Sequence, residues 1–305
     1  MIPDYQSIYQ PLLKLLSDDG EHPIREIINQ LGNHFKLTEE ERKVWLPSGN
    51  AILFDNRVHW ARTYLSKAGL LYNPRRGVVK ITEEGKRVIS SGVISLNNKF
   101  LRQYEGFNSF QTQKKQEKDL PASAEQNEED TLTPEEVLEQ AHTTINDELG
   151  RELLEKVLAS SPQFFERLVV QLLVKMGYGG SLKEAGKATR STKDEGIDGV
   201  IRQDKLGLDI IYIQAKRWKA ENTVSRPELQ KFVGALAGQG AKKGIFITTS
   251  SFTKDAAAYS ARNETKIVLI DGMELQRLMI EFNVGCTLTR SFDLKKLDPD
   301  YFDEL

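Results

Sequence analysis

A polar stretch near the middle of the chain constrains the fold most, because it separates two regions that can each form a hydrophobic core. Residues 108–132 offer almost no apolar side chains and consist mainly of Gln, Glu, Lys, Asp, Ser and Ala. A segment of this composition buries too little apolar surface to offset the entropy lost on ordering. We therefore expect two globular units joined by a mobile acidic linker.

The charge of the chain changes in the same three blocks. Residues 1–100 hold 14 Lys and Arg against 11 Asp and Glu, residues 101–150 hold 4 against 12, and residues 151–292 hold 22 against 16. The formal net charge of −2 hides this pattern. Two mildly basic bodies on either side of an acidic connector permit binding to a polyanion, although local basic patches set the affinity for phosphate.

The cellular compartment is suggested by what the sequence lacks. The single Cys286 cannot form a disulfide within the chain. No apolar run reaches the roughly 20 residues of a membrane-spanning helix, and the first residues do not resemble a signal peptide. We expect a cytoplasmic protein without a membrane partner.

The first unit has the apolar spacing of helices followed by a hairpin. Helices are expected over residues 5–16, 23–31 and 56–68, with shorter ones from Thr38 and Thr82, and a hairpin over residues 70–81. Gly69 provides the C-cap of the longest of these helices. Several helices with a two-stranded wing describe a mostly helical winged-helix unit.

On DNA, such a unit lays its longest helix in the major groove while the wing tip reaches the backbone. The residues expected to contact DNA are Asn56, Arg57, Arg62 and Lys67 on the helix, and Arg75 and Arg76 at the wing tip. His59 and Trp60, on the same helix, are interpreted as solvated or partly buried and as packed, respectively. Winged-helix units also bind proteins, so both kinds of partner stay open.

The second unit alternates helices and strands. Thr133 and Glu136 form a capping box that begins a helix toward Leu158, with a break expected near Gly150. The remaining order is a helix over 161–173, strands near 198–201 and 210–216, a helix over 225–236, a strand over 244–249, a helix over 254–263, a strand over 266–271 and a helix over 272–282. This order predicts an α/β unit with a mixed sheet flanked by helices.

Three polar side chains interrupt the apolar strands of this unit. Period-two alternation sends Gln214 and Lys216 to one face, and Asp198 lies sixteen positions before Gln214, at the end of the expected neighbouring strand. Carboxylate and amide oxygens are hard ligands suited to Mg²⁺. An ammonium group beside such an ion can orient the attacking water and offset charge on phosphorus. These residues predict a nuclease centre.

Glu166 is a carboxylate on an apolar helix face, with Val169 and Val170 one turn further on. A charge in such a place is costly unless something pairs it. A metal site or catalytic lysine could do so, and so could a salt bridge with a buried Arg or Lys; both interpretations remain open at this point.

Several of these segments together resemble a known family. They read Ile-Asp-Gly-Val-Ile from residue 197, Tyr-Ile-Gln-Ala-Lys-Arg-Trp from 212, Arg-Pro-Glu-Leu-Gln from 226, Gly-Ala-Leu-Ala-Gly-Gln from 234 and Gly-Ile-Phe-Ile-Thr-Thr-Ser from 244. The chain resembles the Mrr restriction endonucleases of the PD-(D/E)xK nuclease superfamily over nearly its whole length, including the family's N-terminal winged-helix domain. The segment 205–208 after Asp198 also fits the family's spacing. The resemblance implies a bacterial host-defence enzyme that uses Mg²⁺, and no organic cofactor, to cut double-stranded DNA carrying modified bases, methylated bases in the first instance.

The resemblance also implies roles for five residues. Asp198 corresponds to the superfamily's metal-binding aspartate, Gln214 to a variant of its acidic ligand, and Lys216 to its lysine. Glu166 corresponds to the acidic residue of the first helix and a further metal ligand, and Gln230 to a polar residue that borders the site. The neutral amide of Gln214 lowers the negative charge, so we expect one metal ion at most.

One departure from the family pattern lies before Asp198, where many relatives carry Gly-Asp-Gly-Gly. This chain has Lys-Asp-Glu-Gly over residues 193–196, which removes glycine flexibility and adds charge. The resemblance therefore supplies neither the path of this loop nor a role for its two acidic residues.

These interpretations give a winged-helix DNA-binding domain over residues 1–100, a flexible linker over 101–132, a catalytic domain over 133–292 led by the helix 133–158, and an acidic tail over 293–305. One centre cuts one strand, so a homodimer or higher homo-oligomer is expected, and a homodimer is the economical assembly for a double-strand break. Two alternatives stay open: a catalytically weak DNA-binding protein of the same fold, and a non-enzymatic regulator that uses its winged helix.

Overall fold

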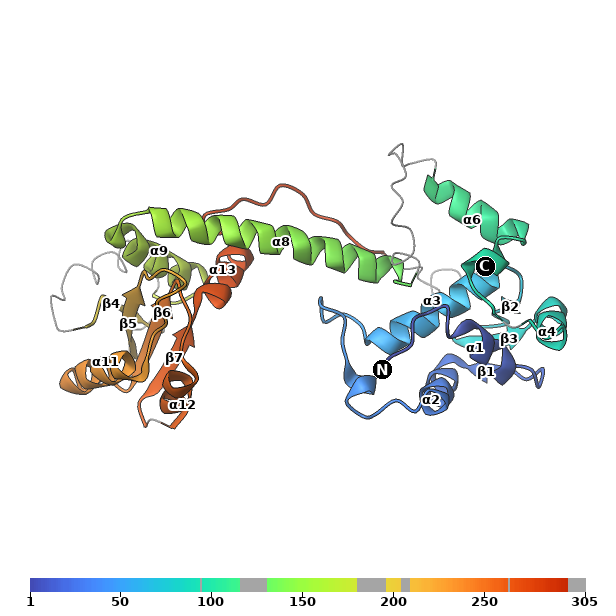
Figure 1. Ribbon diagram of the computed structural model, residues 1–305, viewed down its shortest axis with the longest axis horizontal. Helices are drawn as coiled ribbons and strands as arrows, with labels where there is room; N and C mark the ends of the chain where they lie inside the picture. Colours follow the sequence, from blue (N-terminus) through green and yellow to red (C-terminus); the bar gives the residue numbers. More distant parts are fainter. Residues whose placement is uncertain (94, 116–130, 180–195, 204–208, 263, 296–305) are drawn as a thin grey trace. The chain divides into compact units, whose positions relative to one another are not determined.

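The computed structural model describes residues 1–93, 95–115, 131–179, 196–203, 209–262 and 264–295 (Figure 1). The chain divides into two compact units, one built on Met1–His142 and the other on Thr143–Leu294. The residues 116–130 of the expected linker, the loop 180–195, the segment 204–208 and the end of the acidic tail lie outside the described residues.

The first unit is mostly helical, as the sequence predicts, and carries a small antiparallel sheet. Its elements are α1 (Tyr9–Leu15), β1 (His22–Pro23), α2 (Ile24–His34), the 3-10 turn η1 (Glu41–Lys43), α3 (Leu53–Lys67), β2 (Leu71–Tyr72), β3 (Val78–Ile81), α4 (Glu83–Ser90), α5 (Asn98–Leu101) and α6 (Glu105–Lys115). The wing strands β2 and β3 pair antiparallel, and the two-residue strand β1 adds a third strand on the other side of β3. The sequence did not predict β1, because two residues carry no detectable period.

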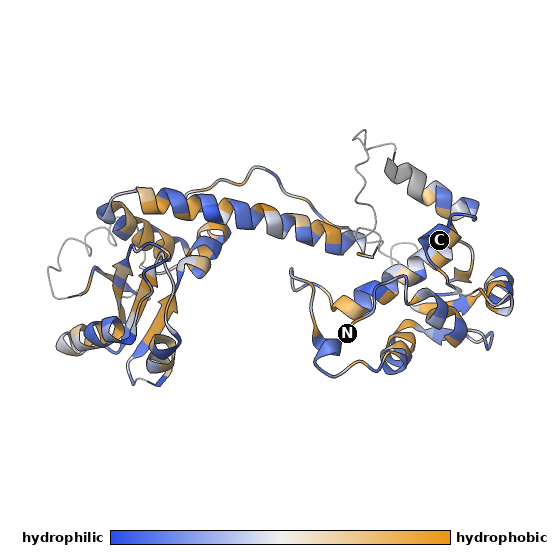
Figure 2. Cartoon of the chain, in the orientation of Figure 1, coloured by the Kyte–Doolittle hydropathy of each residue, from blue (hydrophilic) through white to orange (hydrophobic). Residues whose placement is uncertain are grey.

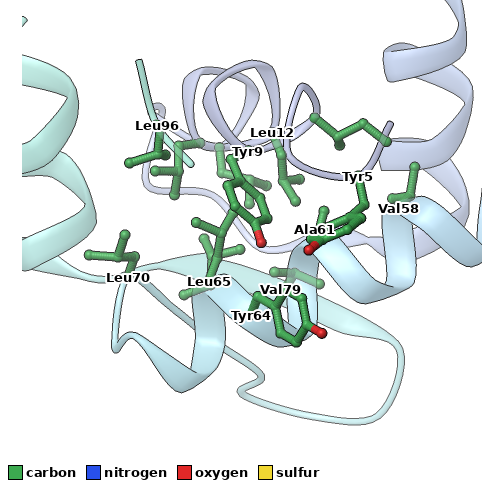
Figure 3. Close-up of a cluster of buried hydrophobic side chains, with 14 of the residues drawn as sticks. Tyr5, Tyr9, Leu12, Val58, Ala61, Tyr64, Leu65, Leu70, Val79 and Leu96 are labelled. Atoms are coloured by element: carbon green, nitrogen blue, oxygen red, sulfur yellow. The ribbon is translucent and has the colours of Figure 1, made fainter. Parts of the chain in front are cut away.

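Aromatic side chains hold the core of this unit together (Figure 3). The ring of Tyr5 meets Tyr64 edge-on at 5.3 Å and Tyr9 at 5.9 Å between centroids. The hydroxyl groups of Tyr5 and Tyr9 both hydrogen-bond to the buried amide of Asn98. Tyr9 Oη donates to Asn98 Oδ1 at 2.7 Å, and Asn98 Nδ2 donates to Tyr5 Oη at 2.6 Å. Helix α5 is therefore joined to α1 by a buried polar contact in which the polar groups are hydrogen-bonded to one another.

Helix α6 corrects the expected linker, which was placed over residues 101–132. Phe107 is fully buried, and its ring meets Tyr64 of α3 at 5.7 Å. Gly106 lets the two helices approach closely, because a Cβ there would stand 2.5 Å from the Lys67 carbonyl oxygen. Two phenylalanines in a mostly polar sequence give too weak a period to reveal a packed helix.

The second unit is a four-stranded mixed sheet between helices. Its elements are α8 (Pro134–Ala159), α9 (Pro162–Lys175), β4 (Gly199–Arg202), β5 (Ile210–Lys216), α11 (Arg226–Gly238), β6 (Lys243–Thr248), α12 (Lys254–Arg262), β7 (Lys266–Ile270) and α13 (Gly272–Glu281). The strand order is β4-β5-β6-β7, with β4 antiparallel to β5 and the other pairs parallel. The α/β prediction is confirmed.

Helix α8 is continuous through Gly150, where the sequence suggested a break. Its residues up to His142 belong to the first unit and those from Thr143 onward to the second. A Cβ at position 150 would stand 2.9 Å from atoms of the Gln276 side chain, so the glycine serves close packing against α13.

Two apolar layers cover the sheet, and its strands are almost uniformly hydrophobic (Figure 2). On one face Ile211 and Ile213 of β5 pack with residues of α8, α9 and α13. On the other face Phe246 of β6 packs with Phe232 of α11 and with α12. Within the described parts of the chain, no helix is both long enough and apolar enough to cross a membrane.

Candidate active site

The site forms where two neighbouring strands meet in opposite directions. Gly199 of β4 pairs with Ile213 of β5, and Asp198 N donates to the Ile213 carbonyl oxygen at 2.8 Å. Asp198 thus stands directly before the first residue of β4. Because the strands are antiparallel, the start of β4 lies beside the end of β5, which carries the other candidate residues.

The Asp198 carboxylate is held by two donors from β5. Gln214 Nε2 donates to Asp198 Oδ2, and Ala215 N donates to the same oxygen at 2.8 Å. Gln214 is only 2% exposed, so its amide is fixed by its surroundings. Gly196, at φ +109°, permits this packing, since a Cβ there would stand 3.3 Å from Gln214 Oε1. The carboxylate and amide are therefore ordered before any substrate arrives.

Glu166 approaches this pair from α9, a helix whose apolar face packs on β4 and β5. Burial, with repulsion from Asp198, raises the pKa of the Glu166 carboxyl above its ordinary value. Among the described residues no ion pair joins Glu166 to an Arg or Lys. The salt-bridge interpretation therefore finds no support in the described structure, and the Asp198 carboxylate is close enough to Glu166 to disfavour its ionisation.

This donor set fits a hard divalent cation. Asp198 and Glu166 offer carboxylate oxygens and Gln214 an amide oxygen, which are ligand types that Mg²⁺ accepts when waters and substrate oxygens complete its shell. In the described part of the chain no three His, Cys, Asp or Glu side chains gather at one place. A cation bound near Asp198 and Glu166 would relieve the repulsion between their carboxyl groups.

Lys216 is the last residue of β5 and is half-buried. Alternation places it on the same face of β5 as Gln214, opposite the apolar layer that contains Ile213 and Ala215. Gln230 lies on α11 and is exposed. Asp198 and Gln214 are hydrogen-bonded and Glu166 is within electrostatic reach of Asp198. Among the described residues no hydrogen bond links Gln230 to any of the other four.

The residues after Lys216 serve the fold. Arg217 Nη1 donates to the Leu158 carbonyl oxygen in the last turn of α8, where the helix dipole favours a cation. Trp218 packs against the apolar layer under α11. The sequence missed Thr248 and Thr249, two buried threonines at the end of β6 that hydrogen-bond to the backbone of Lys216 and Trp218. The sequence pattern that could have identified them is a pair of hydroxyl-bearing residues at the end of an apolar strand.

On α3, Asn56 and Arg57 do not lie on an open surface. Asn56 is 6% exposed; its Oδ1 accepts from Thr133 Oγ1 at 2.8 Å and its Nδ2 donates to Glu135. Arg57 Nη2 donates to Glu136 Oε1 at 2.6 Å. This corrects the expectation of a DNA-facing pair, because the acidic first turn of α8 covers both. The sequence showed the capping box of Thr133 but not its partner helix.

The other four candidate DNA contacts differ in exposure. Arg62 is half-buried, and Lys67 is exposed with its ammonium 5.5 Å from the centre of the Phe110 ring. Arg75 and Arg76 are exposed at the turn between β2 and β3, and Arg75 pairs with Glu21 at 3.3 Å. The wing tip and the end of α3 are therefore the accessible basic parts of this set.

Comparison with known proteins defines the class that this fold and site belong to. Residues 157–279, which include Glu166, Asp198, Gln214 and Lys216, match the restriction endonuclease domain family called the Mrr catalytic domain. Residues 5–91 match the Mrr N-terminal domain. A curated relative from Escherichia coli (strain K12), a type IV methyl-directed restriction enzyme named EcoKMrr, is 36% identical over 308 residues and is aligned over 99% of both chains. The chain belongs to the Mrr family of restriction endonucleases.

Two solved structures are weaker matches. The DNA modification-dependent restriction endonuclease AspBHI shares 18% identity over 45% of this chain and 36% of its own, with a TM-score of 0.37. MspJI, solved with a 27-mer oligonucleotide, shares 23% over 54% of this chain and 37% of its own, with a TM-score of 0.29. This chain thus spans little more than a third of either protein.

Proposed function

We propose that this restriction endonuclease hydrolyses phosphodiester bonds of double-stranded DNA that carries modified, in the first instance methylated, bases, and that it uses Mg²⁺. The observation that supports the proposal is the hydrogen-bonded pair of Asp198 and Gln214, with Glu166 in electrostatic reach of Asp198 and Lys216 on the same strand as Gln214, two positions further on. The name of the E. coli relative, which is methyl-directed, supports the choice of substrate.

Each residue has a distinct part in this reaction. Asp198, Glu166 and the amide oxygen of Gln214 would hold the cation, which supplies Lewis acidity toward a phosphoryl oxygen. Lys216 donates hydrogen bonds to the scissile phosphate and to the attacking water, and its charge offsets the negative charge that develops on the equatorial oxygens. The hydrogen bonds from Gln214 and from the backbone of Ala215 hold the Asp198 carboxylate in place, so that this side chain needs to move less during the reaction.

For the winged helix we propose backbone contacts through Arg62, Lys67, Arg75 and Arg76. Phosphate contacts of this kind give affinity without sequence selection. Full insertion of α3 into a major groove would require Asn56 and Arg57 to leave the acidic turn of α8. We also propose that a homodimer makes double-strand breaks, because each chain supplies one centre.

The test is cleavage of matched plasmids, one unmethylated and others carrying the patterns of different methyltransferases, in Mg²⁺ and in EDTA. Lys216→Ala and Asp198→Ala should abolish cutting while DNA binding stays measurable. Lys266→Ala is the matched control, because Lys266 is an exposed lysine at the start of β7, the opposite end of the same sheet.

Cutting of a methylated plasmid alone, dependent on Mg²⁺ and on Lys216, is the expected result. Equal cutting of the unmethylated plasmid would refute the substrate class. Cutting that survives both alanine substitutions would refute the site. Intact DNA binding without cutting on any plasmid would favour the alternative of a catalytically weak DNA-binding protein.

A further inference from the structure

The backbone at Lys216 is held from the neighbouring strand by side chains that are not part of the proposed centre. Lys216 pairs with Thr248 in the parallel register of β5 and β6, and β5 ends there. The Lys216 carbonyl oxygen accepts from Thr248 Oγ1 at 2.9 Å, from Thr249 N at 3.2 Å and from Trp218 N at 3.1 Å. Three donors on one carbonyl leave the peptide after Lys216 little freedom.

A second hydroxyl fixes the chain two residues further on. Thr249 Oγ1 donates to the Trp218 carbonyl oxygen at 2.6 Å. Thr248 is completely buried and Thr249 is 2% exposed, so neither hydroxyl can exchange its partner for bulk water. Together they hold both ends of the short segment from Lys216 to Trp218.

The direction of the Thr248 bond is set by its own surroundings. Ser250 N donates to Thr248 Oγ1 at 3.1 Å, which occupies an acceptor site of that hydroxyl. A hydroxyl has one proton to give, and the Lys216 carbonyl oxygen can only accept it. The 2.9 Å bond to the Lys216 carbonyl oxygen therefore takes the proton of Thr248, and in the 3.2 Å contact between the two hydroxyl groups Ser250 Oγ is then the donor.

We propose that Thr248 and Thr249 are positioning residues of the nuclease centre, which fix where the Lys216 ammonium stands by clamping the backbone that carries it. The inference rests on the proposed catalytic role of Lys216. Neither threonine needs to touch DNA. Misplacement of a catalytic group by about 1 Å can cost on the order of 100-fold in rate, so loss of the clamp should slow the chemical step rather than weaken binding.

The test uses the full-length chain and single-turnover cleavage at saturating DNA, with the dissociation constant for DNA measured separately in EDTA. Thr248→Val keeps the shape and removes the hydroxyl, and Thr248→Ser keeps the hydroxyl. We expect the valine variant to cut roughly 10- to 100-fold more slowly with DNA affinity unchanged within about two-fold. The serine variant should cut at nearly the parent rate.

Ser260→Ala is the matched control for stability. Ser260 Oγ of α12 donates to the Ile267 carbonyl oxygen of β7 at 3.1 Å, so this variant also loses a buried hydroxyl bond to a strand carbonyl, but away from the site. It should lower the unfolding midpoint about as much as Thr248→Val and leave the cleavage rate unchanged.

Two results would overturn the proposal: a parent-like rate for Thr248→Val, or an equal slowing by Ser260→Ala. Lys216→Ala in the same assay separates this failure from failure of the site. An inactive Lys216→Ala beside a fully active Thr248→Val would reject the clamp alone, whereas an active Lys216→Ala would reject the catalytic assignment and the clamp with it.

Discussion

Removing one member of the ion pair between Arg57 and Glu136 should strongly destabilise the first unit. The two side chains are 13% and 8% exposed, and Arg57 donates to Glu136 from both Nε and Nη2. Removing one member of such a buried pair leaves an uncompensated charge and typically costs about 3–5 kcal/mol. Glu136 Oε2 also accepts from Thr133 N at 3.0 Å, so Glu136→Ala removes half of the capping box as well.

We therefore expect Glu136→Ala to lower the free energy of unfolding of this unit by about 3–5 kcal/mol. Glu136→Gln keeps one acceptor for Arg57, and two backbone carbonyls, of Ile2 and Pro3, still accept from Arg57 Nη1. This variant should lose about 1.5–3 kcal/mol, the value of a hydrogen bond to a charged group.

The assay is equilibrium unfolding in urea, followed by tryptophan fluorescence. Trp45 and Trp60 lie in the first unit and Trp218 in the second, so a Trp218→Phe background reports the first unit alone. With a slope of about 2 kcal/mol per M, Glu136→Ala should move the midpoint by roughly 1.5–2.5 M. The double variant Arg57→Met with Glu136→Leu should lose much less, because an apolar pair replaces both charges.

An unchanged midpoint for Glu136→Ala would refute the reasoning, since it would mean that the first turn of α8 does not rest on α3 in solution. DNA affinity offers a second readout. If Arg57 contacts phosphate once released, the Glu136→Gln variant should bind DNA more tightly than the parent, and more steeply with falling salt. Equal affinity and equal salt slope would argue that α3 binds DNA without Arg57.

Three further outcomes follow from the site. Glu166→Gln should abolish cutting yet raise the unfolding temperature at neutral pH. Because the pKa of Glu166 is raised in the folded state, ionising this carboxyl costs stability once the pH exceeds the ordinary Glu pKa of about 4.3. The stability gained by the glutamine variant should therefore vanish in more acidic solution. Gly196→Ala should cost about 1–3 kcal/mol in urea unfolding and slow cleavage, because position 196 has φ +109° and a Cβ there would crowd the Gln214 amide. Gln214→Glu should lower the unfolding midpoint in EDTA and make it more sensitive to added Mg²⁺ than in the parent, because a third carboxylate would join Asp198 and Glu166; equal sensitivity would count against this charge argument.

The order of elements in the second unit could be predicted because apolar periodicity and helix caps indicate the same elements. Apolar strands joined by capped helices gave the order of elements, and alternation along β5 gave the shared face of Gln214 and Lys216. Register was harder to predict. The pairing of Gly199 with Ile213, which sets the start of β4 beside the end of β5, joins two strands and is not stated by the alternation within either of them.

The contacts that the sequence could not reveal join positions far apart along the chain. Asn56 and Arg57 look like surface residues of a DNA-reading helix, and only tertiary structure shows that Glu135 and Glu136 engage them. The clamp on Lys216 likewise joins residues 32 positions apart. Side-chain hydrogen bonds to distant backbone leave no period and no local composition for a pattern to detect.

The place of β4 in the sheet bears on how the enzyme responds to heat. Among the described strands β4 is an edge strand that pairs through four residues with β5 alone, while β5 and β6 lie in the interior of the sheet. Edge segments of this kind open at a lower free-energy cost than the body of a domain. Whenever β4 frays, Asp198 leaves Lys216 although the rest of the sheet stays folded. Cutting should therefore fade at temperatures below the melting transition, and the amide hydrogens of β4 should exchange with solvent before those of β6.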